Sequence, residues 1–161
     1  MLPHLDAAYN LARWLTRNDH DAQDVVQEAM LRAYRHFDGL RGEPRPWLLA
    51  VVRNACFTWL KANRPAEAEP LDDVADDALP GPEAAVARSV DRRLLNEAIA
   101  ALPVQFREVL VLRELEDLSY RDIARIAGVP IGTVMSRLSR ARRLLGESMR
   151  VVAAPRLKVH K

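Results

Sequence analysis

The sequence predicts an all-α protein built from two small helical domains, and three observations support this. Strand patterns are scarce along the 161 residues, whereas apolar residues recur at intervals of three and four. An acidic, proline-containing segment separates two groups of helical patterns, and the second group holds a helix-turn-helix pattern. We expect a three-helix N-terminal domain (1–64), a flexible acidic linker (65–87), a four-helix C-terminal domain (88–150) and a basic tail (151–161).

Composition narrows the class of protein. Apolar residues make up 49% of the chain, enough for a packed core, and the formal net charge is only +2. The lone Cys56 excludes an internal disulfide, fits a reducing compartment and is expected in the core. The histidines lack metal-site spacing, no run reaches the length of a membrane span, and the N-terminus lacks a signal pattern. We therefore expect a cytoplasmic protein without a metal or cofactor.

Three helices are expected in the N-terminal domain. An apolar stripe predicts a helix over residues 5–15, and the cluster at 18–21 ends it and offers caps for the next helix. One stripe of that second helix is expected to face the core: Val26, Met30, Ala33, Tyr34 and Phe37. Its opposite face carries Asp24, Gln27, Glu28, Leu31 and Arg35. A loop at 38–44 follows, and Pro46 is expected to open a third helix that ends near Ala62.

The segment from Pro65 to about Glu83 has a different character. Its charged residues are all acids, set among prolines, so it should not pack alone and reads as a linker. Helical patterns resume near Ala84, stop around Pro103 and restart at Phe106.

The helix-turn-helix pattern begins at Ser119, which has Asp122 three residues later in the spacing of a capping box. Gly128 can stop that helix and turn the chain, and Pro130 suits the first turn of the next helix. The inward stripe of this second helix is Ile131, Val134, Leu138, Ala141 and Leu145. We expect DNA contacts from its polar and basic residues: Thr133, Ser136, Arg137, Ser139, Arg140 and Arg143.

This residue set suits the major groove of DNA. Arginine can bind a guanine edge through two parallel hydrogen bonds, and hydroxyl groups can contact phosphates or base edges. The alternative is an ordinary amphipathic helix with a solvated basic face, since arginine is a good helix former. The cap at Ser119, the glycine at Gly128 and the short turn favour DNA reading.

The order of these parts resembles the extracytoplasmic-function (ECF) group of the sigma-70 family of bacterial RNA polymerase sigma factors. Asp21–Tyr34 is similar to the family's helix that docks on the clamp helices of the largest polymerase subunit. Pro46–Ala55 resembles the start of the helix that opens the transcription bubble at the minus-ten element. Leu102–Leu110 and Gly128–Val134 look like the domain that reads the minus-thirty-five element.

The resemblance implies a non-enzymatic transcription initiation factor that binds core RNA polymerase at the clamp helices and flap, recognises promoter DNA at two elements and promotes strand opening. It also implies an anti-sigma factor as a partner. The implied polymerase-binding residues are Asp24, Gln27, Glu28 and Leu31. The implied minus-ten residues are Arg53, Asn54, Thr58, Trp59 and Lys61.

Several of these roles have plainer alternatives. The Asp24 to Leu31 face could be merely solvated, Asn54 could tie down local backbone, and Trp59 could belong to the core. The 38–44 loop corresponds to the family's pocket for a flipped-out base, whereas Phe37 could simply complete the core. The acidic linker either enters the RNA channel, as in the family, or is a soluble spacer.

Two positions depart from the family pattern. Thr58 stands where many members carry an acid, and Met135 occupies a position that is polar or basic in part of the family. Both concern which promoter sequence is read.

A competing hypothesis is a helix-turn-helix regulator that binds DNA as a dimer and is not a polymerase subunit. Under it, the Asp24 to Glu28 face and the Asn54 helix would have no role. An enzyme has little support, because the sequence shows no nucleophile and base pair, phosphate-binding loop or metal cluster.

Overall fold

The computed structural model describes residues 2–39, 42–69 and 92–159, which form helices and turns without any strand. The N-terminal domain contains α1 (Leu5–Thr16), α2 (Asp19–Arg35) and α3 (Pro44–Asn63). The C-terminal domain contains α4 (Arg92–Ala100), α5 (Val104–Leu110), a π-helical turn η4 (Val111–Leu115), α6 (Tyr120–Ala127) and α7 (Ile131–Val159). Short 3-10 turns lie at Leu2–His4 and Phe37–Gly39. The predicted all-α class is confirmed.

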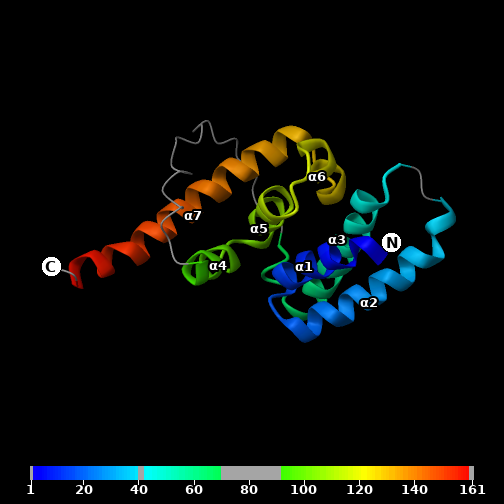
Figure 1. Ribbon diagram of the computed structural model, residues 1–161, viewed down its shortest axis with the longest axis horizontal. Helices are drawn as coiled ribbons and strands as arrows, with labels where there is room; N and C mark the ends of the chain where they lie inside the picture. The colour runs from blue at the N-terminus through cyan, green and yellow to red at the C-terminus, as the bar shows by residue number, and fades with distance from the viewer. Residues whose placement is uncertain (1, 40–41, 70–91, 160–161) are drawn as a thin grey trace.

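The three helices of the N-terminal domain pack against one another in all three pairs (Figure 1). Asn18 caps α2, because its side chain accepts a hydrogen bond from the Asp21 backbone N–H at 3.0 Å. The core is apolar and includes Leu11, Leu15, Leu48, Leu49 and Leu60. Cys56 lies in this core, as expected.

The expected inward stripe of α2 is wrong at its C-terminal end. Val26 and Ala33 are buried, but Tyr34 is 77% exposed and Phe37 is 43% exposed. The last turns of α2 extend past α1 (Figure 1), and Phe37 lies in the 3-10 turn that follows α2. Phe37 therefore does not complete the core.

In the C-terminal domain, α5 is buried on all sides, by α7, α6 and η4 of its own domain and by α1 of the other. A helix in such a position is normally apolar all round, yet α5 carries Gln105, Arg107 and Glu108. These polar side chains must find partners inside the protein.

The helix-turn-helix forms as predicted. The Ser119 hydroxyl accepts a hydrogen bond from the Asp122 backbone N–H at 3.1 Å, and α6 begins at the next residue. Gly128 adopts a left-handed conformation, with φ of 69°, and ends α6. The expected inward stripe of α7 is wrong at Ile131, which is 44% exposed at the first turn; burial begins at Val134.

The two domains pack against each other. Helix α3 lies along α6, and α1 lies against α5 and η4 (Figure 1). Residues 65–69, expected at the start of the linker, form a turn in which Ala68 is buried. The rest of the expected linker and the helical pattern near Ala84 fall mostly within 70–91, outside the described residues.

Candidate polymerase and nucleic-acid interfaces

The predicted polymerase-binding residues are all exposed on one face of α2: Asp24, Gln27, Glu28 and Leu31. Leu31 is 59% exposed, unusual for a leucine in a folded domain. Glu28 pairs with Arg32 at 3.0 Å, one helical turn away. The structure thus brings carboxylate, amide and apolar groups together on an accessible surface.

Tyr34 extends the exposed face of α2, although it was predicted to lie in the core. It lies three residues after Leu31 and seven after Gln27, so the three side chains share one side of the helix. The three-residue spacing from Leu31, which was predicted to be exposed, could have revealed that Tyr34 is exposed as well.

Helix α3 exposes three of the five residues expected at the minus-ten element. Asn54, Thr58 and Lys61 follow one another at intervals of four and three, so they line one exposed face. The Thr58 hydroxyl donates to the Asn54 backbone carbonyl at 3.0 Å. The Asn54 side-chain oxygen accepts a hydrogen bond from Arg53 at 3.4 Å. The amide N–H₂ of Asn54 takes no part in that hydrogen bond.

The other two, Trp59 and Arg53, lie elsewhere. Trp59 is half-buried and packs against the core, and the Arg64 guanidinium lies 5.3 Å from its ring centroid. Arg53 points into the contact between the domains, where Glu108 binds it. Trp59 thus takes the position expected of a core side chain, and Arg53 lies off the exposed face.

The Arg53–Glu108 pair is the most buried ion pair described. Nε and Nη2 of Arg53 donate to the two Glu108 carboxylate oxygens at 3.0 and 3.2 Å, and the Glu108 side chain has no exposed area. The guanidinium also stacks over Phe57, 3.8 Å from the ring centroid. Burial raises the pKa of the Glu108 carboxyl, while the guanidinium groups of Arg53 and Arg137 act in the opposite direction.

Of the α7 arginines expected to contact DNA, Arg137 is buried and Arg140 is half-buried. Arg137 is only 7% exposed, and its positive charge acts to lower the pKa of the buried Glu108 carboxyl. Arg140 lies over Phe106, 5.2 Å from the ring centroid. Both arginines therefore contribute to the packing of the C-terminal domain in this structure.

A different side of α7 is accessible. Met135 is 53% exposed, Arg143 is exposed, and Ser139 is half-buried between them at intervals of four residues. Thr133 and Ser136 are half-buried beside this side, and the Ser136 hydroxyl donates to the Thr133 carbonyl at 3.1 Å. This accessible side of α7 thus combines Arg143 with hydroxyl groups and the apolar Met135.

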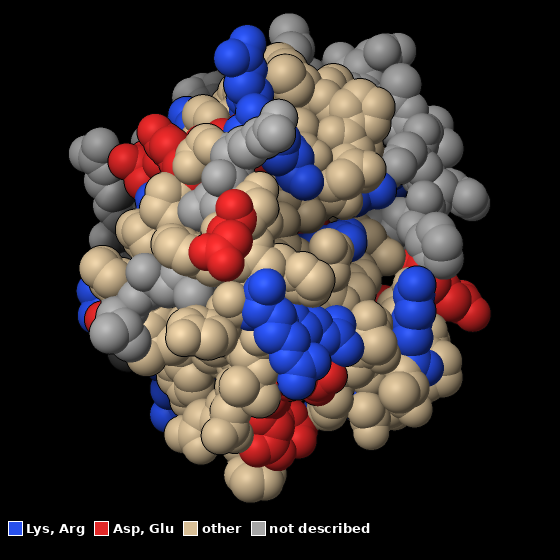
Figure 2. All heavy atoms as spheres, turned by 90° about the vertical axis from the view of Figure 1, so that its right-hand side faces the viewer, with Lys and Arg blue, Asp and Glu red and all other residues tan. Residues whose placement is uncertain are grey.

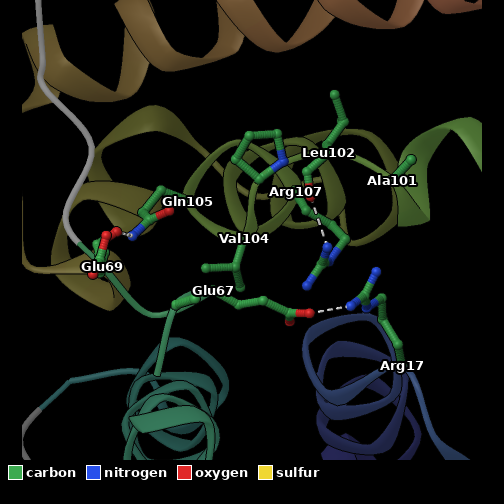
Figure 3. Close-up of a pocket in the computed structure, with 10 residues that line it drawn as sticks. Arg17, Glu67, Glu69, Ala101, Leu102, Val104, Gln105 and Arg107 are labelled. Atoms are coloured by element: carbon green, nitrogen blue, oxygen red, sulfur yellow. Dashed lines mark hydrogen bonds and ion pairs between the residues drawn. The ribbon is translucent and has the colours of Figure 1, made fainter. Parts of the chain in front are cut away.

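A cavity of about 380 Å³ lies where the two domains meet (Figure 3). Arg17 from the end of α1 pairs with Glu67, and Gln105 donates to the Glu69 carbonyl at 2.7 Å. Arg107 points toward Arg17 and Glu67, and burial lowers its pKa to about 10, so it stays charged at neutral pH. The polar groups around the cavity chiefly bind one another and backbone carbonyls.

Sequence reasoning missed the polar residues that join the domains. Glu116 accepts a hydrogen bond from Asn10 at 2.8 Å and pairs with Arg45 at 3.0 Å, and Glu108 binds Arg53. One sequence signal could have revealed these contacts. An arginine, Arg107, and an acid, Glu108, interrupt the apolar run from Val104 to Leu112.

Figure 2 shows basic and acidic side chains next to one another on the face that it presents. Within the described residues, no three His, Cys, Asp or Glu side chains gather as a metal site would require. The same part of the chain contains no helix long and apolar enough to cross a membrane.

Comparison with known proteins assigns the family. Residues 2–65 match the family described as Sigma-70 region 2, and residues 92–145 match Sigma-70, region 4. The ECF RNA polymerase sigma-E factor of Haemophilus influenzae is 37% identical over 84% of this chain and 77% of its own length. The ECF RNA polymerase sigma factor SigM of Mycobacterium tuberculosis is 36% identical over 89% of this chain and 74% of its own length.

A solved structure agrees with these relatives. The sigma factor RpoE from Bartonella quintana, in complex with the anti-sigma factor NepR, superposes with a TM-score of 0.72 and 28% identity over 93% of this chain and 94% of that one. The chain therefore belongs to the ECF group of the sigma-70 family of bacterial RNA polymerase sigma factors.

Proposed function

We propose that this sigma factor binds core RNA polymerase in the cytoplasm, recognises promoter DNA at two elements and promotes strand opening, without catalysis of its own. The observation that carries the proposal is the presence of two accessible polar helix faces, on α3 and α7, in separate domains that match sigma regions 2 and 4 in order. A chain built this way can hold two DNA segments while a third face, on α2, holds the polymerase.

The polymerase-docking surface is the exposed face of α2. It combines the acids Asp24 and Glu28 with Gln27, Leu31 and Tyr34. An apolar centre flanked by charged and polar groups is typical of binding hot spots, in which aromatic side chains are enriched. The acids would accept hydrogen bonds from basic side chains of the clamp helices, and a further contact would be made with the flap.

The minus-ten contact is made by α3. Asn54 offers both a donor and an acceptor to a base edge, and Lys61 can bind a phosphate. Arg53 and Trp59 would need to move from their present contacts to take part. Promoter opening then follows from differential binding, since capture of unstacked bases shifts the equilibrium toward melted DNA.

The upstream contact is made by the accessible side of α7. Ser136, Ser139 and Arg143 supply hydrogen-bond donors there, and Met135 adds an apolar group. Thr133 lies in the first turn, where this motif approaches the base edges. Arg137 is buried, so its side chain would have to rearrange to reach DNA, whereas Arg140 is half-buried, like Ser136 and Ser139, and lies over Phe106.

An anti-sigma factor is the proposed regulatory partner. Support comes from the Bartonella quintana relative, a sigma factor that was solved in complex with an anti-sigma factor.

Run-off transcription with purified core polymerase tests the function. The chain should associate with core enzyme and direct a transcript from a promoter selected by sequencing the RNAs that rise on its overproduction. A chain that ignores core polymerase and binds a palindromic site as a dimer would instead support an independent regulator.

A further inference from the structure

The contact between the domains buries one side of the proposed minus-ten helix. Arg53 is on α3 and Glu108 is on α5, 55 positions apart in the chain, and two hydrogen bonds of 3.0 and 3.2 Å join them. Only 17% of the Arg53 side chain is exposed. Phe57 closes one face of the guanidinium, and Nε and Nη2 are bound to Glu108, so these two donors are not available to a phosphate while the pair is intact.

A second set of contacts acts in the same place. Glu116 of the C-terminal domain binds Arg45 and Asn10 of the N-terminal domain, and its side chain is 10% exposed. In both contacts the acid belongs to the C-terminal domain and an arginine belongs to α3. Two carboxylates of the C-terminal domain thus bind arginines of the helix proposed to bind DNA.

The closed arrangement does not fit simultaneous binding of both promoter elements. Their names place them about 25 base pairs apart, which is roughly 85 Å of duplex at 3.4 Å per base pair. In the structure, α3 packs directly on α6, the first helix of the helix-turn-helix. The two domains must separate before both helices can reach their elements.

Separation need not leave a buried charge without a partner. Arg137 is on α7, which packs against the α5 helix of Glu108, and its positive charge acts to lower the pKa of that carboxyl. When the domains part, Glu108 keeps Arg137, and Arg53 becomes available to a phosphate. An isolated buried charge would cost several kcal/mol, so this exchange of partners keeps opening accessible.

We propose that the Arg53–Glu108 pair is an intramolecular latch, in which Glu108 competes with promoter DNA for Arg53 and holds the free chain closed. The competition between Glu108 and DNA for Arg53 rests on the proposed function of α3. The closing of the two domains by the Arg53–Glu108 pair does not depend on that function. Polymerase docking or an inhibitor would then act on an equilibrium already present in the chain.

Fluorescence energy transfer within the full-length chain tests the latch without DNA or polymerase. Dyes would be attached to cysteines introduced at the exposed positions Gln23 in α2 and Glu147 in α7. Cys56 stays unlabelled because burial raises its pKa to about 12. Glu108→Gln keeps the side-chain shape but removes the charge, and it should raise the open-to-closed ratio about tenfold or more.

The matched control is Arg13→Met, which removes an ion pair with Asp19 within the N-terminal domain and should leave the transfer efficiency unchanged. Arg53→Met should open the domains as Glu108→Gln does. If Glu108→Gln fails to fold, Glu116→Gln provides the second test, with a smaller shift in the same direction. Folded variants whose transfer histograms match the wild type would overturn the latch.

A second measurement tests the competition for Arg53. The probe is short, random-sequence, single-stranded DNA, because a phosphate contact does not depend on base sequence. Glu108→Gln should bind it several-fold more tightly than the wild type, and Arg53→Met should not gain. If Glu108→Gln opens the domains but does not bind DNA more tightly than the wild type, the competition for Arg53 is overturned. If neither the wild type nor any variant binds DNA, the result counts against the function proposed for α3.

Discussion

Arg107 in α5 donates a hydrogen bond to the backbone carbonyl of Leu15 in α1, at 3.2 Å. The same guanidinium donates to the carbonyls of Ala100 and Leu102, at 3.0 and 2.7 Å. Carbonyls at the end of a helix lack partners within that helix, and a buried cation satisfies them. Arg107 thus joins the ends of α1 and α4 across the domain boundary.

Arg107→Met should lower the free energy of unfolding by about 2–3 kcal/mol, because it leaves buried carbonyls without a charged donor. The measurement is chemical denaturation followed by circular dichroism. Arg93→Met, on the exposed side of α4, is the control and should change stability by less than about 0.5 kcal/mol. Equal stability of the two variants would contradict the structural role of Arg107.

The double variant Gln27→Ala, Glu28→Ala should weaken binding to core polymerase by more than about 1 kcal/mol, as expected for residues at the centre of an interface. Both side chains are exposed, so the fold should be unaffected. Binding is measured by fluorescence anisotropy with labelled protein. Arg13→Ala, exposed on α1, is the control, and undiminished affinity of the double variant would place the docking face elsewhere.

Arg143→Ala and Arg137→Ala should have different effects. Arg143 is exposed, so its loss should weaken upstream-element binding by about 1–3 kcal/mol with little change in stability. Arg137 is buried in the C-terminal domain, so its loss should lower the melting temperature. Gel-shift titration and thermal denaturation of both variants separate the roles; a stable Arg137→Ala protein with weakened DNA binding would restore Arg137 as a reader.

Cys56 should make stability depend on pH in the alkaline range. Burial, followed by the Glu108 charge, raises the pKa of the thiol from 9.0 to about 12, while Arg53 opposes the shift. Above pH 9 the unfolded thiol ionises and the folded one does not, so the free energy of unfolding should fall with rising pH until about 12.

The matched variant for this prediction is Cys56→Ala, whose stability curve should lack that part of the slope. Iodoacetamide should also fail to alkylate the folded protein at pH 8 and should react once the chain is unfolded. Rapid alkylation of the folded chain would contradict the burial of Cys56.

Local signals in the sequence were enough to predict the helices. Ser119 and Gly128 act on backbone groups within a few residues of themselves, so the helix-turn-helix could be read directly. Helical spacing likewise predicted the exposed face of α2 from Asp24 to Leu31, whereas the α3 residues were implied by the resemblance to the family. Each of these features depends on residues that are neighbours in the chain.

The errors came from packing between distant segments. Arg137 was predicted to contact DNA, but it is buried in the C-terminal domain, where α7 packs against α5. Arg53 is held by Glu108, 55 residues away. Tyr34 is exposed near the end of α2, where that helix extends past α1, a matter of relative helix position that periodicity does not encode.

Asn54 provides the sharpest test of promoter opening. Asn54→Ala should leave polymerase binding intact and reduce open-complex formation, because it removes a donor and acceptor from the exposed face of α3. Asn63→Ala, at the end of the same helix, is the control; its side chain donates only to the Trp59 carbonyl in this structure.

Permanganate footprinting of the promoter tests the central claim most directly, because permanganate oxidises unpaired thymines. Thymines near the minus-ten element should become reactive only when core polymerase and this chain are both present, and Asn54→Ala should reduce that reactivity. A promoter that stays unreactive with both proteins bound, or equal reactivity with wild type and Asn54→Ala, would contradict strand opening by α3.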